Sequence, residues 1–144
     1  MQVLKILSQI WKSGANIYLD KKDDRIAIDN QKLIPAEVMQ AAEQNFQSID
    51  AWFKSWKDAS SEKVTLMKMV HQICGWQDNE KLQQWLCDDA DGMILFEDWM
   101  IELANNGWTD IYEDYRQFEN EKSHSMAQEL YLRAVTYAKK RVNA

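Results

Sequence analysis

The sequence predicts a mostly α (α+β) protein: an N-terminal helix–β-hairpin–helix module followed by an acidic bundle of four or five helices. Glycine (four) and proline (one) are too scarce for an all-β fold, which needs frequent turns. Hydrophobic residues make up 46% of the 144 residues and include seven Trp and seven Met, enough to form a buried core. Apolar residues recur every three or four positions along most of the chain, as in amphipathic helices.

The first element is an amphipathic helix over residues 2–13. Gly14 follows the last apolar position and is expected to end the helix, since glycine readily adopts the left-handed conformation of a helix C-terminus. The apolar positions are Val3, Leu4, Leu7, Ile10 and Trp11.

Residues 15–20 and 25–29 alternate apolar and polar side chains across a polar turn, which predicts a β-hairpin. Ile17 and Leu19 of the first strand and Ile26 and Ile28 of the second are expected to face the first helix, because a lone hairpin is barely stable in water.

A second helix is predicted to start after Pro35 and to continue to about Lys57. The polar stretch 58–61 then separates a module of residues 1–57 from a helical region of residues 61–144. We expect the two parts to pack together as one compact unit.

The later region shows only helical spacing. A first apolar stripe ends at Gly75, and Asp78 can cap a short second helix. Gly92 is expected to interrupt the helical pattern, and a further helix is expected to end at residues 105–107. Thr109 and Asp110 are predicted to open another helix, and a break near 120–123 precedes the last. The stripes are Val64, Met67, Val70, Ile73 and Cys74; Leu82, Trp85 and Leu86; Met93, Phe96, Trp99, Met100 and Leu103; Ile111, Tyr115 and Phe118; and Met126, Leu130, Ala134 and Tyr137.

Charge and composition narrow the functional classes. Residues 1–56 contain seven basic and seven acidic residues, and the remainder ten and sixteen, so the net charge of −6 falls in the later region. Such a surface repels nucleic-acid phosphates, and direct nucleic-acid binding is not expected. The absence of a long apolar stretch and of a cleavable leader pattern predicts a cytoplasmic protein that does not contact a membrane.

Residues 1–56 combine an apolar helix ending at Gly14, strands at 17–20 and 25–28, and the segment Leu33-Ile-Pro-Ala-Glu-Val38 leading a helix through Trp52-Phe53. This arrangement resembles the TubC-type N-terminal docking domain. The family's modules capture a short segment of a partner subunit in peptide and polyketide synthases, so the resemblance implies protein docking. Those modules normally precede large synthase domains, which are not found here; similar modules also look to be present in small stand-alone proteins of bacterial mobile elements.

A two-stranded sheet also has two edges to which an extended peptide can add as a third strand. We therefore predict a non-catalytic adaptor whose partner is another protein, through a short extended segment or a basic enzyme subunit; a second copy of the chain is a further candidate. Solvated edges, or edges covered by the later helices, are the plain alternative. The predicted partner-binding residues are Tyr18, Asp20, Arg25, Ala27 and Asp29 on the hairpin, and Trp56 and Trp108 as exposed aromatics at element ends.

Catalysis, cofactors and metals have little support in the sequence. The run 88–92 fits an EF-hand loop only in part, because Cys87 stands at the first ligand position, and an acidic turn in which Asp91 caps the next helix is the better interpretation. His71, Cys74, Cys87 and His124 lack the paired spacing of a zinc site. No nucleophile elbow or phosphate-binding loop occurs, and we expect no enzyme activity and no cofactor.

A second function class stays open. An accessory subunit or inhibitor of a nucleic-acid-processing complex, encoded by a bacterial mobile element, would use the acidic surface to bind a basic enzyme.

Overall fold

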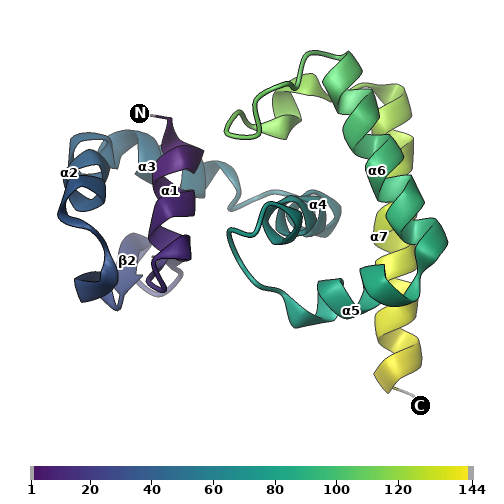
Figure 1. Ribbon diagram of the computed structural model, residues 1–144, viewed down its shortest axis with the longest axis horizontal. Helices are drawn as coiled ribbons and strands as arrows, with labels where there is room; N and C mark the ends of the chain where they lie inside the picture. The colour runs from purple at the N-terminus through teal and green to yellow at the C-terminus, as the bar shows by residue number, and fades with distance from the viewer. Residues whose placement is uncertain (1, 143–144) are drawn as a thin grey trace. The chain divides into compact units, whose positions relative to one another are not determined.

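The computed structural model describes residues 2–142, and the chain forms two compact units (Figure 1). Unit 1 contains Met1–Ala59 and Cys74–Gln77, and unit 2 contains Ser60–Ile73 and Asp78–Ala144. The fold is mostly helical with one small antiparallel hairpin after the first helix, which confirms the predicted class. The two predicted parts include residue 1 and residues 143–144, which lie outside the described residues. The packing of the two parts into one compact unit stays a prediction.

Unit 1 begins with helix α1 (Val3–Lys12), which ends where the sequence predicted. Gly14 has a φ of 94°, and its N–H donates to the carbonyl of Trp11 at 3.1 Å. This left-handed conformation strains any residue with a Cβ atom, so the position favours glycine.

Strands β1 (Asn16–Asp20) and β2 (Arg25–Asp29) pair antiparallel. Ile17 lies opposite Ile28 and Leu19 opposite Ile26, so the four predicted inward residues share one face. Both α1 and α3 (Phe46–Ser55) pack on β1, and the Trp11 indole N–H donates to the Ile17 carbonyl at 3.3 Å. The hairpin is therefore fixed to the helices through its first strand.

The single helix predicted from Pro35 to Lys57 is wrong. A 3-10 turn η1 (Gln31–Leu33) precedes α2 (Ala36–Gln44), and Asn45 separates α2 from α3. The Asn45 amide donates to the carbonyl of Ala41 at 2.8 Å, and side chains that bond to nearby backbone in this way compete with helix continuation.

Unit 2 is built from α4 (Ser61–Ile73), α5 (Glu80–Asp88), α6 (Ala90–Asn105), a 3-10 turn η2 (Tyr115–Phe118) and α7 (Glu121–Val142). Figure 1 shows α6 and α7 side by side and running in opposite directions, and α4 and α5 also pack on α7. No helix in the described part of the chain combines the length and apolar character needed to cross a bilayer.

The buried face of α4 differs from the predicted stripe. Leu66, Met69 and His71 are buried, whereas Ile73 is 43% exposed. Because α4 contacts both α5 and α7, its buried surface is wider than one stripe and is rotated from the positions that spacing alone selects.

Aromatic side chains form the centre of unit 2. The fully buried Trp99 ring stacks on Phe96 at 5.6 Å between centroids and meets Tyr115 edge-on at 5.2 Å. Such pairs add to the stabilisation that apolar burial provides.

The helix predicted from Thr109 through Phe118 does not form. Asp110 accepts a hydrogen bond from the Tyr112 backbone N–H, and Asp114 accepts one from that of Arg116, each at 2.9 Å. These side chains form local turns that compete with helical hydrogen bonding, and only the short η2 remains.

The break predicted near 120–123 is confirmed. The Asn120 side chain accepts from the Ser123 N–H at 2.8 Å, and the Ser123 hydroxyl accepts from the Asn120 N–H at 2.9 Å. This reciprocal pair resembles a capping box and marks the start of α7.

The cap predicted at Asp78 lies instead at Asn79, which accepts from the Leu82 N–H at 3.2 Å at the start of α5.

Candidate functional site

The hairpin brings five of the seven predicted partner-binding residues onto one face. Tyr18 lies directly opposite Ala27, and Asp20 lies opposite Arg25, with Asp29 at the far end of the same face. Side chains at alternate positions of paired strands share a face, so this grouping follows from the register. We call Tyr18, Asp20, Arg25, Ala27 and Asp29 the hairpin outer face.

The two carboxylates of the hairpin outer face accept local hydrogen bonds. The Asp20 carboxylate accepts from the Lys22 backbone N–H at 2.9 Å in the turn. The Tyr18 hydroxyl lies 3.5 Å from an Asp29 carboxylate oxygen, a long contact between exposed groups. The negative charge of Asp29, followed by desolvation, raises the pKa of Tyr18. Like any tyrosine, it is a neutral hydrogen-bond donor at physiological pH.

The backbone of β2 provides the second part of the candidate site. The sheet consists of β1 and β2 alone within the described residues, so alternate N–H and C=O groups on the outer edge of each strand have no third strand to pair with. The packing of α1 and α3 falls on β1. Because α1 and α3 pack chiefly on β1, the edge of β2 is the candidate position for an added peptide strand.

The two predicted aromatic anchors are not part of this face. Trp56 lies at the C-terminal end of α3, half-buried, with its ring 5.9 Å from that of Trp52. The prediction that Trp108 is exposed is wrong: it is 7% exposed, its indole N–H donates to the Glu113 carbonyl at 3.1 Å, and its ring lies 6.3 Å from that of Trp99. Trp108 covers the core because the chain folds back after α6.

The acidic run 88–92 does not form an EF-hand loop. Helix α6 begins at Ala90, so Asp91 and Asp98 project from a helix rather than from a ligating loop. The cap of α6 is Asp89 and not Asp91 as predicted: one Asp89 oxygen accepts from the Gly92 N–H at 3.0 Å. Gly92 is thus inside the first turn of α6 and does not interrupt a helix.

Other residues considered for metal or nucleophilic chemistry are dispersed. His71 is buried, Cys74 is half-buried, and Cys87 and His124 are exposed. Burial raises the pKa of the Cys74 thiol, which disfavours the reactive thiolate. Within residues 2–142, no cluster of three or more His, Cys, Asp or Glu side chains could hold a metal ion.

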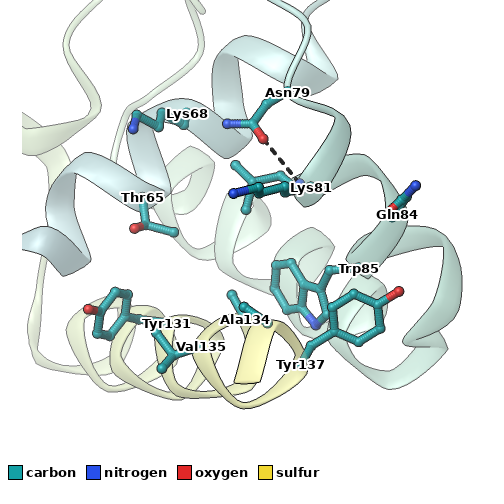
Figure 2. Close-up of a pocket in the computed structure, with 12 residues that line it drawn as sticks. Thr65, Lys68, Asn79, Lys81, Gln84, Trp85, Tyr131, Ala134, Val135 and Tyr137 are labelled. Atoms are coloured by element: carbon teal, nitrogen blue, oxygen red, sulfur yellow. Dashed lines mark hydrogen bonds between the residues drawn. The ribbon is translucent and has the colours of Figure 1, made fainter. Parts of the chain in front are cut away.

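A groove in unit 2 is a feature that sequence reasoning missed. It lies between α4, α5 and α7 and has a volume of about 340 Å³ (Figure 2). Its apolar wall comes from residues that the sequence interpreted only as core stripes, such as Leu82, Trp85 and Ala134. Because these residues come from separate helices, no local pattern could reveal the groove; the spacing of Tyr131, Ala134 and Ala138 indicates only a shared helix face. We call this feature the α5–α7 groove.

Comparisons of the chain with protein-family models, with curated proteins and with solved structures gave no match.

Proposed function

We propose that the protein is a non-catalytic interaction adaptor in which unit 1 docks an extended segment of a partner protein along β2 of the hairpin. The observation that carries this proposal is the register of the hairpin. It places Tyr18, Arg25 and the other residues of the hairpin outer face on one surface, beside a strand edge that no other described strand covers.

Strand addition explains how so small a surface can bind. Main-chain hydrogen bonds to β2 supply affinity that does not depend on the sequence of the partner. Side chains of the hairpin outer face supply selectivity, since Tyr18 offers an aromatic ring with a polar hydroxyl and Arg25 offers a charge. The carboxylates of Asp20 and Asp29 favour a partner segment that carries basic residues.

The test compares two double variants as bait in affinity capture with mass-spectrometric identification. Tyr18→Ala with Arg25→Glu changes the hairpin outer face, and the affinity of the captured partner should fall at least about tenfold. Phe46→Ala with Lys32→Glu is the matched control, because both residues are exposed in unit 1 and neither belongs to β1 or β2. It makes the same kinds of change and should leave affinity unchanged.

Hydrogen exchange gives a second and direct readout. Backbone amides of β2 should exchange more slowly in the complex than in the free protein, because strand addition pairs edge groups that are otherwise solvated. Equal affinity of the two double variants, with unchanged exchange in β2, would place the interface outside the hairpin.

One observation favours an alternative role as an accessory subunit or inhibitor of a nucleic-acid-processing complex. On α6, Ile94 and Ile101 are 56% and 58% exposed and lie two turns apart on one face. Exposed Glu97 and Asp98 lie between them in the sequence. An apolar pair beside acidic groups suits a basic protein surface. A complex that is weakened by Ile94→Ser with Ile101→Ser, and by raised salt, would support this role over hairpin docking.

A further inference from the structure

The α5–α7 groove has the character of a ligand site rather than of a gap between helices. Its apolar lining comes from Leu82 and the buried Trp85 of α5 and from Ala134, Val135 and Ala138 of α7. Figure 2 shows Tyr131 and Tyr137 toward opposite ends of the α7 wall. A volume of about 340 Å³ falls at the lower end of the range of small-molecule pockets.

The charged side chains that line the described part of the groove are opposite in sign to the protein's net charge. Its lining includes the lysines Lys68 and Lys81 and no aspartate or glutamate, in a chain whose net charge is −6. Neither lysine has an ion-pair partner within 4.0 Å among residues 2–142. Figure 2 places both lysines across the groove from α7. An anion beside Lys68 and Lys81 would therefore meet two positive charges that are not engaged in an ion pair.

The Tyr137 end of the groove is fixed by contacts in unit 2. The Tyr137 hydroxyl donates to the carboxylate of Asp88, and the Trp85 indole N–H donates to Asp89 at 3.0 Å. These bonds hold the two aromatic rings by their polar atoms, and both side chains line the groove. The Tyr137 ring is half-buried and keeps apolar surface for contact with a ligand, whereas Trp85 is only 1% exposed and backs the wall of the groove.

We propose that the α5–α7 groove binds a small organic anion with an apolar chain or ring. The apolar part lies against Leu82, Val135 and Tyr137, which line the groove and are partly exposed, and its burial provides the driving force. The anionic head lies at Lys68 and Lys81, which select it over a neutral or cationic analogue. This site lies in unit 2 and involves no residue of the hairpin, so it is independent of the proposed docking function.

The test uses decanoate as the probe, kept below its micelle concentration, in a titration of ¹⁵N-labelled protein followed by amide chemical shifts. Saturable shifts should appear along α5 and α7 with a Kd in the millimolar range or tighter, as expected for a ligand of this size. Decanol and decyltrimethylammonium share the apolar chain but lack the negative charge. Each should bind at least about tenfold more weakly than decanoate.

Two variants locate the binding. Lys68→Gln with Lys81→Gln should weaken decanoate binding at least about tenfold, whereas Lys139→Gln, an exposed lysine of α7 outside the lining, should not change it. Ala138→Trp places a large ring in the groove from an exposed position and should abolish the shifts while the circular dichroism spectrum is retained. No saturable binding, equal binding of the three probes, or equal effects of the lysine variants and the control would each overturn the proposal.

Discussion

Arg133 of α7 binds both carboxylate oxygens of Asp89, with Nη2 2.7 Å from Oδ1 and Nε 3.0 Å from Oδ2. Asp89 lies between α5 and α6, and it also accepts from the Trp85 indole and from the Gly92 N–H. One carboxylate therefore connects three helices, and a bidentate charge-assisted pair of this kind is stronger than a neutral hydrogen bond.

Asp89→Asn should lower the free energy of unfolding at neutral pH by about 1 to 2 kcal/mol. The hydrogen bond from Arg133, followed by those from Gly92 and Trp85, lowers the pKa of Asp89 from 3.8 to about 2. Since the folded-state pKa is the lower one, the stabilisation is present above pH 3.8 and is lost as pH falls toward 2. Urea unfolding across this interval should show the two proteins converging. A difference that stays constant down to pH 2 would contradict the role of the carboxylate charge.

Gly92→Ala should destabilise unit 2 by about 1 to 3 kcal/mol, although alanine is the better helix former. An added Cβ would lie 2.7 Å from an Asp89 oxygen and 3.2 Å from the Trp85 ring. That oxygen cannot easily move, because Trp85 and Arg133 both bind it. Thermal unfolding of the variant measures the effect.

The Asp89→Ala background provides the control for this interpretation. Without the carboxylate the closest contact disappears and only the 3.2 Å contact with the Trp85 ring remains, so Gly92→Ala should destabilise much less there. The same loss in both backgrounds would show that the clash with Asp89 is not the cause.

The sequence predicted the fold where local chemistry decides the structure. Gly14 ends α1 and the alternation of Ile17 and Leu19 forms a strand, because a positive φ and a two-residue period are local signals. The predictions failed where competing hydrogen bonds decide. Asn45 ends one helix inside an unbroken apolar pattern, and Asp110 and Asp114 turn the chain where spacing suggested a helix.

The two candidate sites differ in the same respect: one depends on local signals and the other on tertiary packing. The residues of the hairpin outer face could be grouped from the sequence because strand alternation and one short turn fix their register. The α5–α7 groove could not, since Lys68, Trp85 and Tyr131 meet only through the packing of three helices. The exposure of Trp108 could not be predicted either. An aromatic residue at the end of an element is buried or exposed according to the path of the loop that follows it.

Tyr115 should remain un-ionised at pH values where an ordinary tyrosine ionises. Its hydroxyl donates to the Lys63 carbonyl at 2.9 Å, and burial, followed by the charge of Glu119, raises its pKa far above the usual 10.0. Because the folded state favours the neutral phenol, its stabilisation is present below pH 10 and is lost as pH rises further. An alkaline titration followed by phenolate absorbance should show one of the five tyrosines ionising only as the protein unfolds.

Tyr115→Phe is the variant that assigns this late ionisation. It should remove the late step and lower stability by about 1 to 2 kcal/mol, since the Lys63 carbonyl loses its donor. Tyr112→Phe, which removes a less buried neighbouring tyrosine, should retain the late step. If Tyr115→Phe retains it too, another tyrosine is responsible.

Asn120→Ala should destabilise unit 2 by about 1 to 2 kcal/mol, because it removes the cap of the longest helix. The side-chain Oδ1 of Asn120 accepts from the Ser123 N–H at 2.8 Å, and its Nδ2 donates to the Glu102 carboxylate of α6 at 2.9 Å. One side chain therefore both starts α7 and joins it to α6. Ser125→Ala is the matched control, since Ser125 is exposed in the same part of α7 and alanine favours the helix there. Urea unfolding should show a lower midpoint for Asn120→Ala and an equal or higher one for Ser125→Ala. Retained stability in Asn120→Ala would mean that the start of α7 is set by packing on α6 rather than by its cap.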